Sequence, residues 1–340
     1  MTLAFAPPPE FVGKFGGYRS PLLFEDGRRV GRAEQWQARR REILAEWTRL
    51  MGPWPAVIAS PQVAVLRSKK ADGHTVHTTH MEYARGLIQE AALLVPDGRG
   101  PFPAVLVAFY EPQTSLGLNP SNPTCDFGSQ LARRGFVTLS IGAPGGDARK
   151  PELAGARCQP LSHLACVAAN CWHALASLPY VDRSRIGVIG HSYGGKWSMF
   201  AGALWDRFAC VVTSDPGIMF DESRPNINYW EPWYLGLDAA LTRKPGPITS
   251  DSPRTGAYRR MIEEGRDLHE IHALIAPRPF LVSGGSEDTP SRWTALNHRI
   301  EIDRLLHVHD HVAMTNRPDH RPTPDSNADI YAFFERFLTP

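Results

Sequence analysis

Short, almost entirely apolar stretches alternate with amphipathic stretches along most of the chain. The apolar stretches are rich in β-branched and aromatic residues, and they span 104–109, 136–141, 186–189, 210–213, 279–282 and 305–308. Helical spacing of apolar residues marks the stretches 161–177, 196–204, 291–302 and 327–338. Buried strands that alternate with helices predict an α/β fold with a mostly parallel central sheet covered by helices on both faces.

The two ends of this pattern differ from its middle. Residues 75–83 and 86–95 predict an antiparallel pair of strands in front of the parallel sheet. Residues 1–62 are predicted to form an N-terminal extension with one amphipathic helix at 34–50, and residues 63–340 to form the main α/β domain. Residues 217–265 contain the aromatic run 226–234 but no clear strand, so we expect a cap-like insertion.

The clearest chemical signal is a G-x-S-x-G motif formed by Gly190, Ser192 and Gly194. The motif follows an apolar strand stretch and precedes a helical one. A serine on such a sharp strand-to-helix turn is exposed, and glycines let the neighbouring backbone pass closely. The pattern predicts that Ser192 is a nucleophile.

With this motif, residues 63–338 resemble the α/β-hydrolase superfamily, in particular its dienelactone hydrolase and acetyl xylan esterase-like branch. The resemblance implies a triad in the chain order serine, acid, histidine. It also implies that no metal or organic cofactor is needed.

The acid is expected in the loop after the strand stretch at 279–282. The glycine-to-aspartate spacing of similar proteins favours Asp288; Glu287 next to it and Asp215 after the strand at 210–213 remain alternatives. His320, in a loop before the last helical stretch, is the expected base. We expect the backbone N–H groups of Tyr193 and Tyr110 to form the oxyanion hole.

The nucleophile motif also resembles the G-C-S-R-x-G-K pattern of glucuronoyl esterases. The glycines, the serine and Lys196 match, but His191 and Tyr193 stand where that pattern has cysteine and arginine. The resemblance implies that Lys196 contacts sugar hydroxyls. Aromatic residues that could cover sugar faces are Trp230, Trp233 and Trp293.

Other sequence features narrow the class of protein. Lys and Arg number 37 against 35 Asp and Glu, which leaves a net charge of +2 and gives no sign of a nucleic-acid partner. No apolar stretch approaches the length of a membrane span. The five cysteines lack metal spacing, so we expect reduced thiols and a cytoplasmic protein, with a secreted form whose leader has been removed as the alternative. His307, His309 and His311 alternate as on a strand face and are expected to support the His320 loop rather than bind a metal.

These observations predict a serine esterase that cleaves a carboxylic ester through an acyl-enzyme, with an acylated carbohydrate or another small ester as substrate. One alternative is a peptidase or amidase of the prolyl oligopeptidase type. Another is a member of the fold that binds ligands without catalysis. The sequence does not indicate an oligomeric state.

Overall fold

The computed structural model describes residues 3–339 and contains one nine-stranded sheet. The strands are β1 (Val63–Ala71), β2 (His74–Ala84), β3 (Leu87–Pro96), β4 (Phe102–Ala108), β5 (Val137–Ile141), β6 (Val181–His191), β7 (Cys210–Ser214), β8 (Phe280–Gly284) and β9 (Val312–Asn316). Their spatial order is β1-β2-β3-β5-β4-β6-β7-β8-β9. Strands β1, β2 and β3 pair antiparallel, β3 pairs antiparallel with β5, and all later pairs are parallel. The expected fold class is confirmed.

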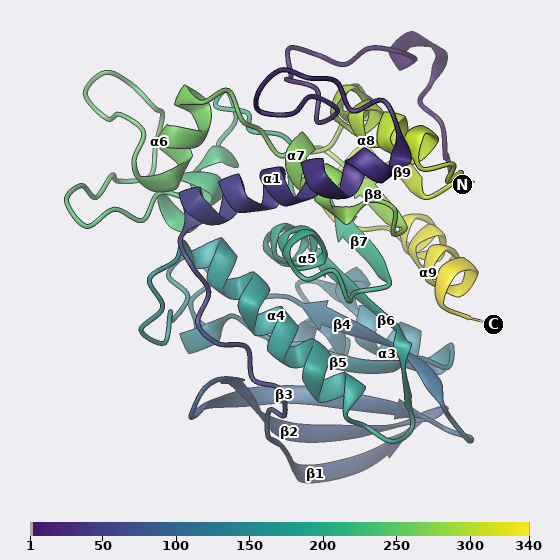
Figure 1. Ribbon diagram of the computed structural model, residues 1–340. Helices are drawn as coiled ribbons and strands as arrows, with labels where there is room; N and C mark the ends of the chain where they lie inside the picture. The colour runs from purple at the N-terminus through teal and green to yellow at the C-terminus, as the bar shows by residue number, and fades with distance from the viewer. Residues whose placement is uncertain (1–2, 340) are drawn as a thin grey trace.

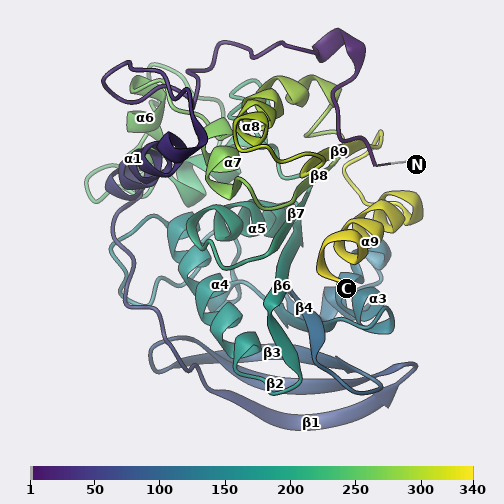
Figure 2. The ribbon, with the colours of Figure 1, turned by 45° about the vertical axis from the view of Figure 1, so that its right-hand side comes forward.

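Helices cover both faces of the sheet (Figures 1 and 2). The longer ones are α1 (Ala33–Met51), α4 (Pro160–Ala176), α5 (Tyr193–Leu204), α8 (Trp293–Leu305) and α9 (Pro324–Leu338). The shorter ones are α2 (Pro112–Ser115), α3 (Phe127–Arg133), α6 (Gly256–Glu263) and α7 (His269–Ile275). Figure 2 shows α3 and α9 on one face and α4, α5 and α7 on the other, with α1 packed outside α7. Strands β4, β5, β7 and β8 are therefore buried on both faces, as their almost entirely apolar sequences require.

The N-terminal extension lies on the helical layer rather than apart from it. Helix α1 packs on α6 and α7, and its Trp36, Ile43 and Trp47 are fully buried. The insertion at 217–265 contains α6 and a short π-helical segment, η4 (Tyr229–Tyr234).

The predicted strand at 305–308 is wrong. These residues end α8 and begin the turn before β9. His307 and Asp310 both have a φ in the left-handed region, at 57° and 56°, so the backbone cannot stay extended there. The alternating histidines consequently do not share a strand face, and His311 instead bonds to the Pro277 carbonyl at 2.5 Å.

Candidate active site

Ser192 occupies the sharp turn between β6 and α5. Its backbone has φ 55° and ψ −113°, which is strained for a residue with a side chain. The Ser192 N–H donates to the Ser214 carbonyl at 2.8 Å, which ties the turn to the end of β7. The sequence expectation of a strand–turn–helix setting for Ser192 agrees with this geometry.

Two glycines make the turn sterically possible. A Cβ atom on Gly190 would lie 2.0 Å from the Gly194 carbonyl oxygen, and one on Gly194 would lie 1.9 Å from the Ala108 carbonyl oxygen. Both distances are far below contact, and the neighbours are backbone atoms. The spacing of G-x-S-x-G is thus a packing requirement of the turn.

His320 lies beside this turn and is oriented by a carboxylate. The His320 Nδ1 is 2.7 Å from Asp215 Oδ2, and the Asp215 side chain is fully buried. The His320 ring lies 4.7 Å, centroid to centroid, from the ring of His191, the residue before Ser192. With Nδ1 bound to the carboxylate, Nε2 is the nitrogen left for proton transfer.

Asp215 is itself held by backbone donors. It follows β7 with a φ of 50°, and it accepts N–H groups from Gly285 at 2.6 Å, Asp288 at 2.8 Å and Glu287 at 3.3 Å. These amides keep the carboxylate in place beside His320.

The prediction that Asp288 contacts His320 is therefore wrong. Asp288 turns its carboxylate toward the start of the insertion, where it accepts from Gly217 N at 2.9 Å and Ile218 N at 2.6 Å. Its pKa is raised by burial and by the nearby charge of Asp215. The acid was expected in the loop after β8, but the carboxylate that contacts His320 follows β7, and the β8 loop contributes only backbone N–H groups to it.

Glu287, the other alternative, is also occupied elsewhere. Its carboxylate lies 3.3 Å from the guanidinium of Arg224 in the insertion. Of the three carboxylates considered, only Asp215 contacts His320.

The two residues predicted to supply the oxyanion donors lie close together, with 5.0 Å between the ring centroids of Tyr110 and Tyr193. Tyr193 is the first residue of α5, so its N–H has no partner within the helix. Tyr110 follows β4, and its carbonyl accepts from Ala143 N at 3.0 Å. Burial, and next the hydrogen bond with the Tyr229 hydroxyl, raise the pKa of the Tyr110 phenol. The Tyr110 hydroxyl thus points to Tyr229 of the insertion, a contact that the sequence prediction, which named only the Tyr110 backbone N–H, did not include.

Lys196 is buried beneath the site rather than open to it. Its ammonium group donates to the Pro216 carbonyl and, at 2.9 Å, to Asn226 Oδ1, and the residue is only 1% exposed. Burial lowers its pKa to about 7. In this arrangement Lys196 anchors the start of the insertion, and its predicted contact with sugar hydroxyls would require that segment to move.

Of the three tryptophans predicted to cover sugar faces, two are buried and one is partly exposed. Trp230 and Trp293 are each 1% exposed, so neither presents a ring face to a substrate here. Trp233 is half-buried and meets Tyr229 edge-on at 4.8 Å between centroids. The Tyr229 hydroxyl lies 3.2 Å from that of Tyr110, so Tyr110, Tyr229 and Trp233 form a continuous row of aromatic side chains.

Arg317 is a residue that the sequence analysis missed. Its guanidinium donates to the carbonyls of Ser283 at 2.8 Å and His320 at 2.6 Å, and to the hydroxyl of Ser214 at 3.2 Å. It therefore joins the ends of β7 and β8 to the histidine loop. An arginine in a loop has no sequence signature for such a role, because its partners are mostly backbone carbonyls.

Two further properties bear on the chemistry. Residues 3–339 contain no cluster of three or more His, Cys, Asp or Glu side chains that could hold a metal ion. Within the same residues, no helix is both long and apolar enough to cross a membrane.

Comparison with known proteins gives matches of two kinds. A model of the prolyl oligopeptidase family matches residues 129–244. The carbohydrate esterase MZ0003 from an unknown prokaryotic organism is 28% identical over 117 residues, which are 32% of this chain and 23% of that protein. The chain thus spans about a quarter of that relative. The 4-O-methyl-glucuronoyl methylesterase 1 of Wolfiporia cocos is 23% identical over 342 aligned positions, 94% of this chain and 80% of that protein.

Solved structures extend the similarity over nearly the whole chain. A glucuronoyl esterase from Solibacter usitatus has a TM-score of 0.75 at 17% identity, and the match covers 94% of this chain and 97% of that one. A glucuronoyl esterase from Teredinibacter turnerae T7901 has a TM-score of 0.68 at 17% identity and covers 98% and 92%. The chain therefore has the α/β-hydrolase fold, and it is similar in sequence and structure to glucuronoyl esterases.

Proposed function

We propose that the chain is a serine carboxylic ester hydrolase that acts on a saccharide ester. Ser192 is the nucleophile, His320 the general base and acid, and Asp215 the carboxylate that orients the histidine. The observation that carries the proposal is the 2.7 Å contact between His320 Nδ1 and the buried Asp215, beside the strained turn of Ser192.

These residues can perform acyl transfer in two balanced steps. In the first, His320 Nε2 takes the Ser192 proton as Oγ bonds to the ester carbonyl carbon, and the carbonyl electron pair moves onto oxygen. The N–H of Tyr193 and a donor from Tyr110 stabilise that oxyanion. The intermediate then expels the alcohol, which receives the proton from His320 and leaves an acyl-Ser192.

The second step repeats the chemistry with water. His320 takes a proton from water as the water oxygen attacks the acyl carbon, and the proton then returns to Ser192 Oγ. A carboxylic acid is released and the enzyme is regenerated. The Asp215 carboxylate orients His320 and stabilises the imidazolium in both steps.

The names of the relatives support a methyl ester of a uronic acid as the substrate class. Several are 4-O-methyl-glucuronoyl methylesterases, and one related crystal structure holds methyl 4-O-methyl-β-D-glucopyranuronate. We expect wild-type protein to hydrolyse this methyl ester, and Ser192→Ala to lose about 10⁴-fold or more in kcat. A fluorophosphonate probe should label the wild type and not Ser192→Ala. Labelling of both proteins, or of neither, would contradict the assignment of Ser192.

A peptidase is the second candidate, because the prolyl oligopeptidase model matches residues 129–244, which include Ser192 and Asp215. A prolyl peptide nitroanilide distinguishes the two functions. We expect kcat/KM for the glucuronate methyl ester to exceed that for the nitroanilide. The reverse order, with normal probe labelling, would favour the peptidase and leave the catalytic residues unchanged.

A further inference from the structure

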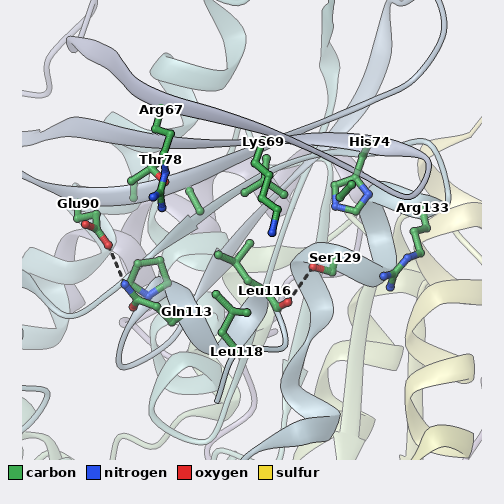
Figure 3. A pocket seen from close by; sticks show the side chains of 15 residues that line it. Arg67, Lys69, His74, Thr78, Glu90, Gln113, Leu116, Leu118, Ser129 and Arg133 are labelled. Atoms are coloured by element: carbon green, nitrogen blue, oxygen red, sulfur yellow. Dashed lines mark hydrogen bonds between the residues drawn. The ribbon is translucent and has the colours of Figure 1, made fainter. Parts of the chain in front are cut away.

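A second concave site lies away from the residues proposed for catalysis. A cavity of about 390 Å³ lies between strands β1–β3 and the segment containing α2 and α3 and is partly open to solvent (Figure 3). Its volume lies in the range of small-molecule sites. None of Ser192, Asp215 and His320 lines it.

The strand register gathers basic side chains on the wall of this cavity. Arg67 pairs across to Thr78 and Lys69 to Val76, and partners in an antiparallel pair point to the same face. Figure 3 shows Arg67 and Lys69 extending from β1 toward the opposite wall, which includes Leu116. Arg133, at the end of α3, lines the cavity as well.

These cations have no neutralising partner within the described residues. Arg67, Lys69 and Arg133 make no side-chain hydrogen bond or ion pair with residues 3–339, although many other arginines of the chain do. The only carboxylate on the wall is that of Glu90, which already accepts from Gln113 Nε2 at 2.7 Å. The cavity therefore has an excess of positive charge, whereas the whole chain is close to neutral.

The rest of the lining is mostly apolar. Val76 and Ala92 contribute from the sheet, and Leu116 and Leu118 contribute from the loop opposite. Leu118 is 67% exposed and forms an apolar edge at the cavity. Two polar residues of the lining are buried. His74 is 1% exposed, and its Nδ1 bonds to the Asp72 carbonyl at 2.9 Å; Ser129 is 6% exposed and donates to the Leu116 carbonyl at 3.2 Å.

We propose that this cavity is a binding site for a small organic anion, in which a carboxylate or phosphate group meets Arg67 and Lys69 and an apolar body packs on Val76, Ala92 and Leu118. The site is distinct from the proposed catalytic centre. Its occupant is a ligand rather than the ester that is hydrolysed.

The adjacent residue Lys70 provides a matched control. It carries the same charge on the same strand but points to the other face, where it pairs with Asp97. Substituting Lys69 or Lys70 by Gln thus removes one positive charge from nearly the same place, and only the first change alters the cavity.

Binding is measured by calorimetry with benzoate, phenyl phosphate and the neutral analogue benzyl alcohol. We expect at least one of the two anions to bind saturably and tenfold or more tighter than benzyl alcohol. Arg67→Gln with Lys69→Gln should weaken that anion at least tenfold, whereas Lys70→Gln should change its affinity less than twofold. The better of the two anions identifies the head group.

A second pair of variants tests the same site from the opposite wall, at a residue whose exposure makes misfolding unimportant. Leu118→Glu should weaken the anion more than Leu118→Gln, because only the first adds a repelling charge. Failure of both anions to bind better than benzyl alcohol would overturn the proposal. Equal losses of anion affinity in the protein with Arg67→Gln and Lys69→Gln and in the Lys70→Gln protein would also overturn it. Binding does not require turnover, so these results are independent of the proposed ester hydrolysis.

Discussion

Asp215 and Asp288 lie 73 positions apart in the chain, but the fold brings the backbone N–H of Asp288 to the carboxylate of Asp215. Asp288 gives its backbone N–H to Asp215, and its carboxylate accepts the N–H groups of Gly217 and Ile218, just after Asp215. One aspartate therefore contacts the histidine, and the other fixes the loop that supports the first.

The two carboxylates should respond differently to the same substitution. Asp215→Asn leaves His320 Nδ1 without a charged partner, and the amide can hold the wrong tautomer, so we expect kcat to fall about 10³- to 10⁴-fold. Asp288→Asn keeps the shape and loses only hydrogen bonds to the insertion, so we expect a fall of less than about tenfold. Steady-state kinetics on an aryl acetate measures both. A larger loss in the Asp288 variant would contradict this order.

Some site residues were accessible from sequence and others were not. Ser192 and its glycines form a motif of five consecutive residues, and His320 precedes a recognisable final helix. The identity of the carboxylate that contacts His320 depends on the orientations of the Asp215 and Asp288 side chains. Hydrogen bonds from backbone amides in distant loops fix these orientations. Arg317 and the Tyr110 hydroxyl act through similar long-range contacts, so no local pattern marks them.

At the scale of elements, most strands and helices follow from the apolar pattern. Helix α4 spans Pro160–Ala176 where the sequence predicted 161–177, and α5 begins at Tyr193, three residues before the predicted start. The strand predicted at 305–308 failed because its apolar pair, Leu305 and Leu306, belongs to the end of α8. Short apolar pairs do not distinguish a helix end from a strand.

The insertion is held by a buried ion pair that its sequence does not indicate. Arg243 Nε lies 2.5 Å from Glu231 Oε2, and the two side chains are 3% and 0% exposed. The same arginine donates to the carbonyls of Gly246 and Glu231. The pair thus connects η4 to the irregular loop that follows it.

Arg243→Met should destabilise the fold strongly, because it leaves Glu231 buried without its partner. Removing one member of a buried pair costs about 3–5 kcal/mol, whereas the exposed neighbour Lys244 should tolerate Lys244→Met within about 0.5 kcal/mol. Urea denaturation followed by circular dichroism measures both. Equal midpoints for the two variants would show that the pair contributes little.

Across the whole molecule, several histidines are buried without charge. Burial lowers the pKa of His163 to about 4 and that of His269 to about 3. Neither ring nitrogen of His163 has a hydrogen-bond partner within the described residues. Below pH 6.5, the unfolded chain binds protons that these histidines exclude when folded, so they make the folded state less stable as the pH falls.

His163→Leu isolates this effect from all other titrating groups. As the pH falls from about 6.5 to about 4, the free energy of unfolding of the variant should rise relative to that of the wild type by about 1.4 kcal/mol per pH unit. Above about pH 6.5 the difference between the two proteins should be constant. Urea unfolding at several pH values provides the measurement. A stability difference that does not change with pH would mean that His163 takes up its proton in the folded state.

The edges of the sheet have a consequence for self-association. An unpaired edge strand is a template for another chain. At the β9 edge, Ala4 forms an antiparallel bridge with Met314, and its carbonyl accepts the Met314 N–H at 3.0 Å. At the other edge, β1 carries the charged residues Arg67, Lys69 and Lys70. A net charge of +2 gives only weak repulsion between copies of this chain. Resistance to edge-to-edge polymerisation therefore depends on these two edges. The chain's own backbone covers part of one edge, and the positive charges of β1 repel a second copy at the other.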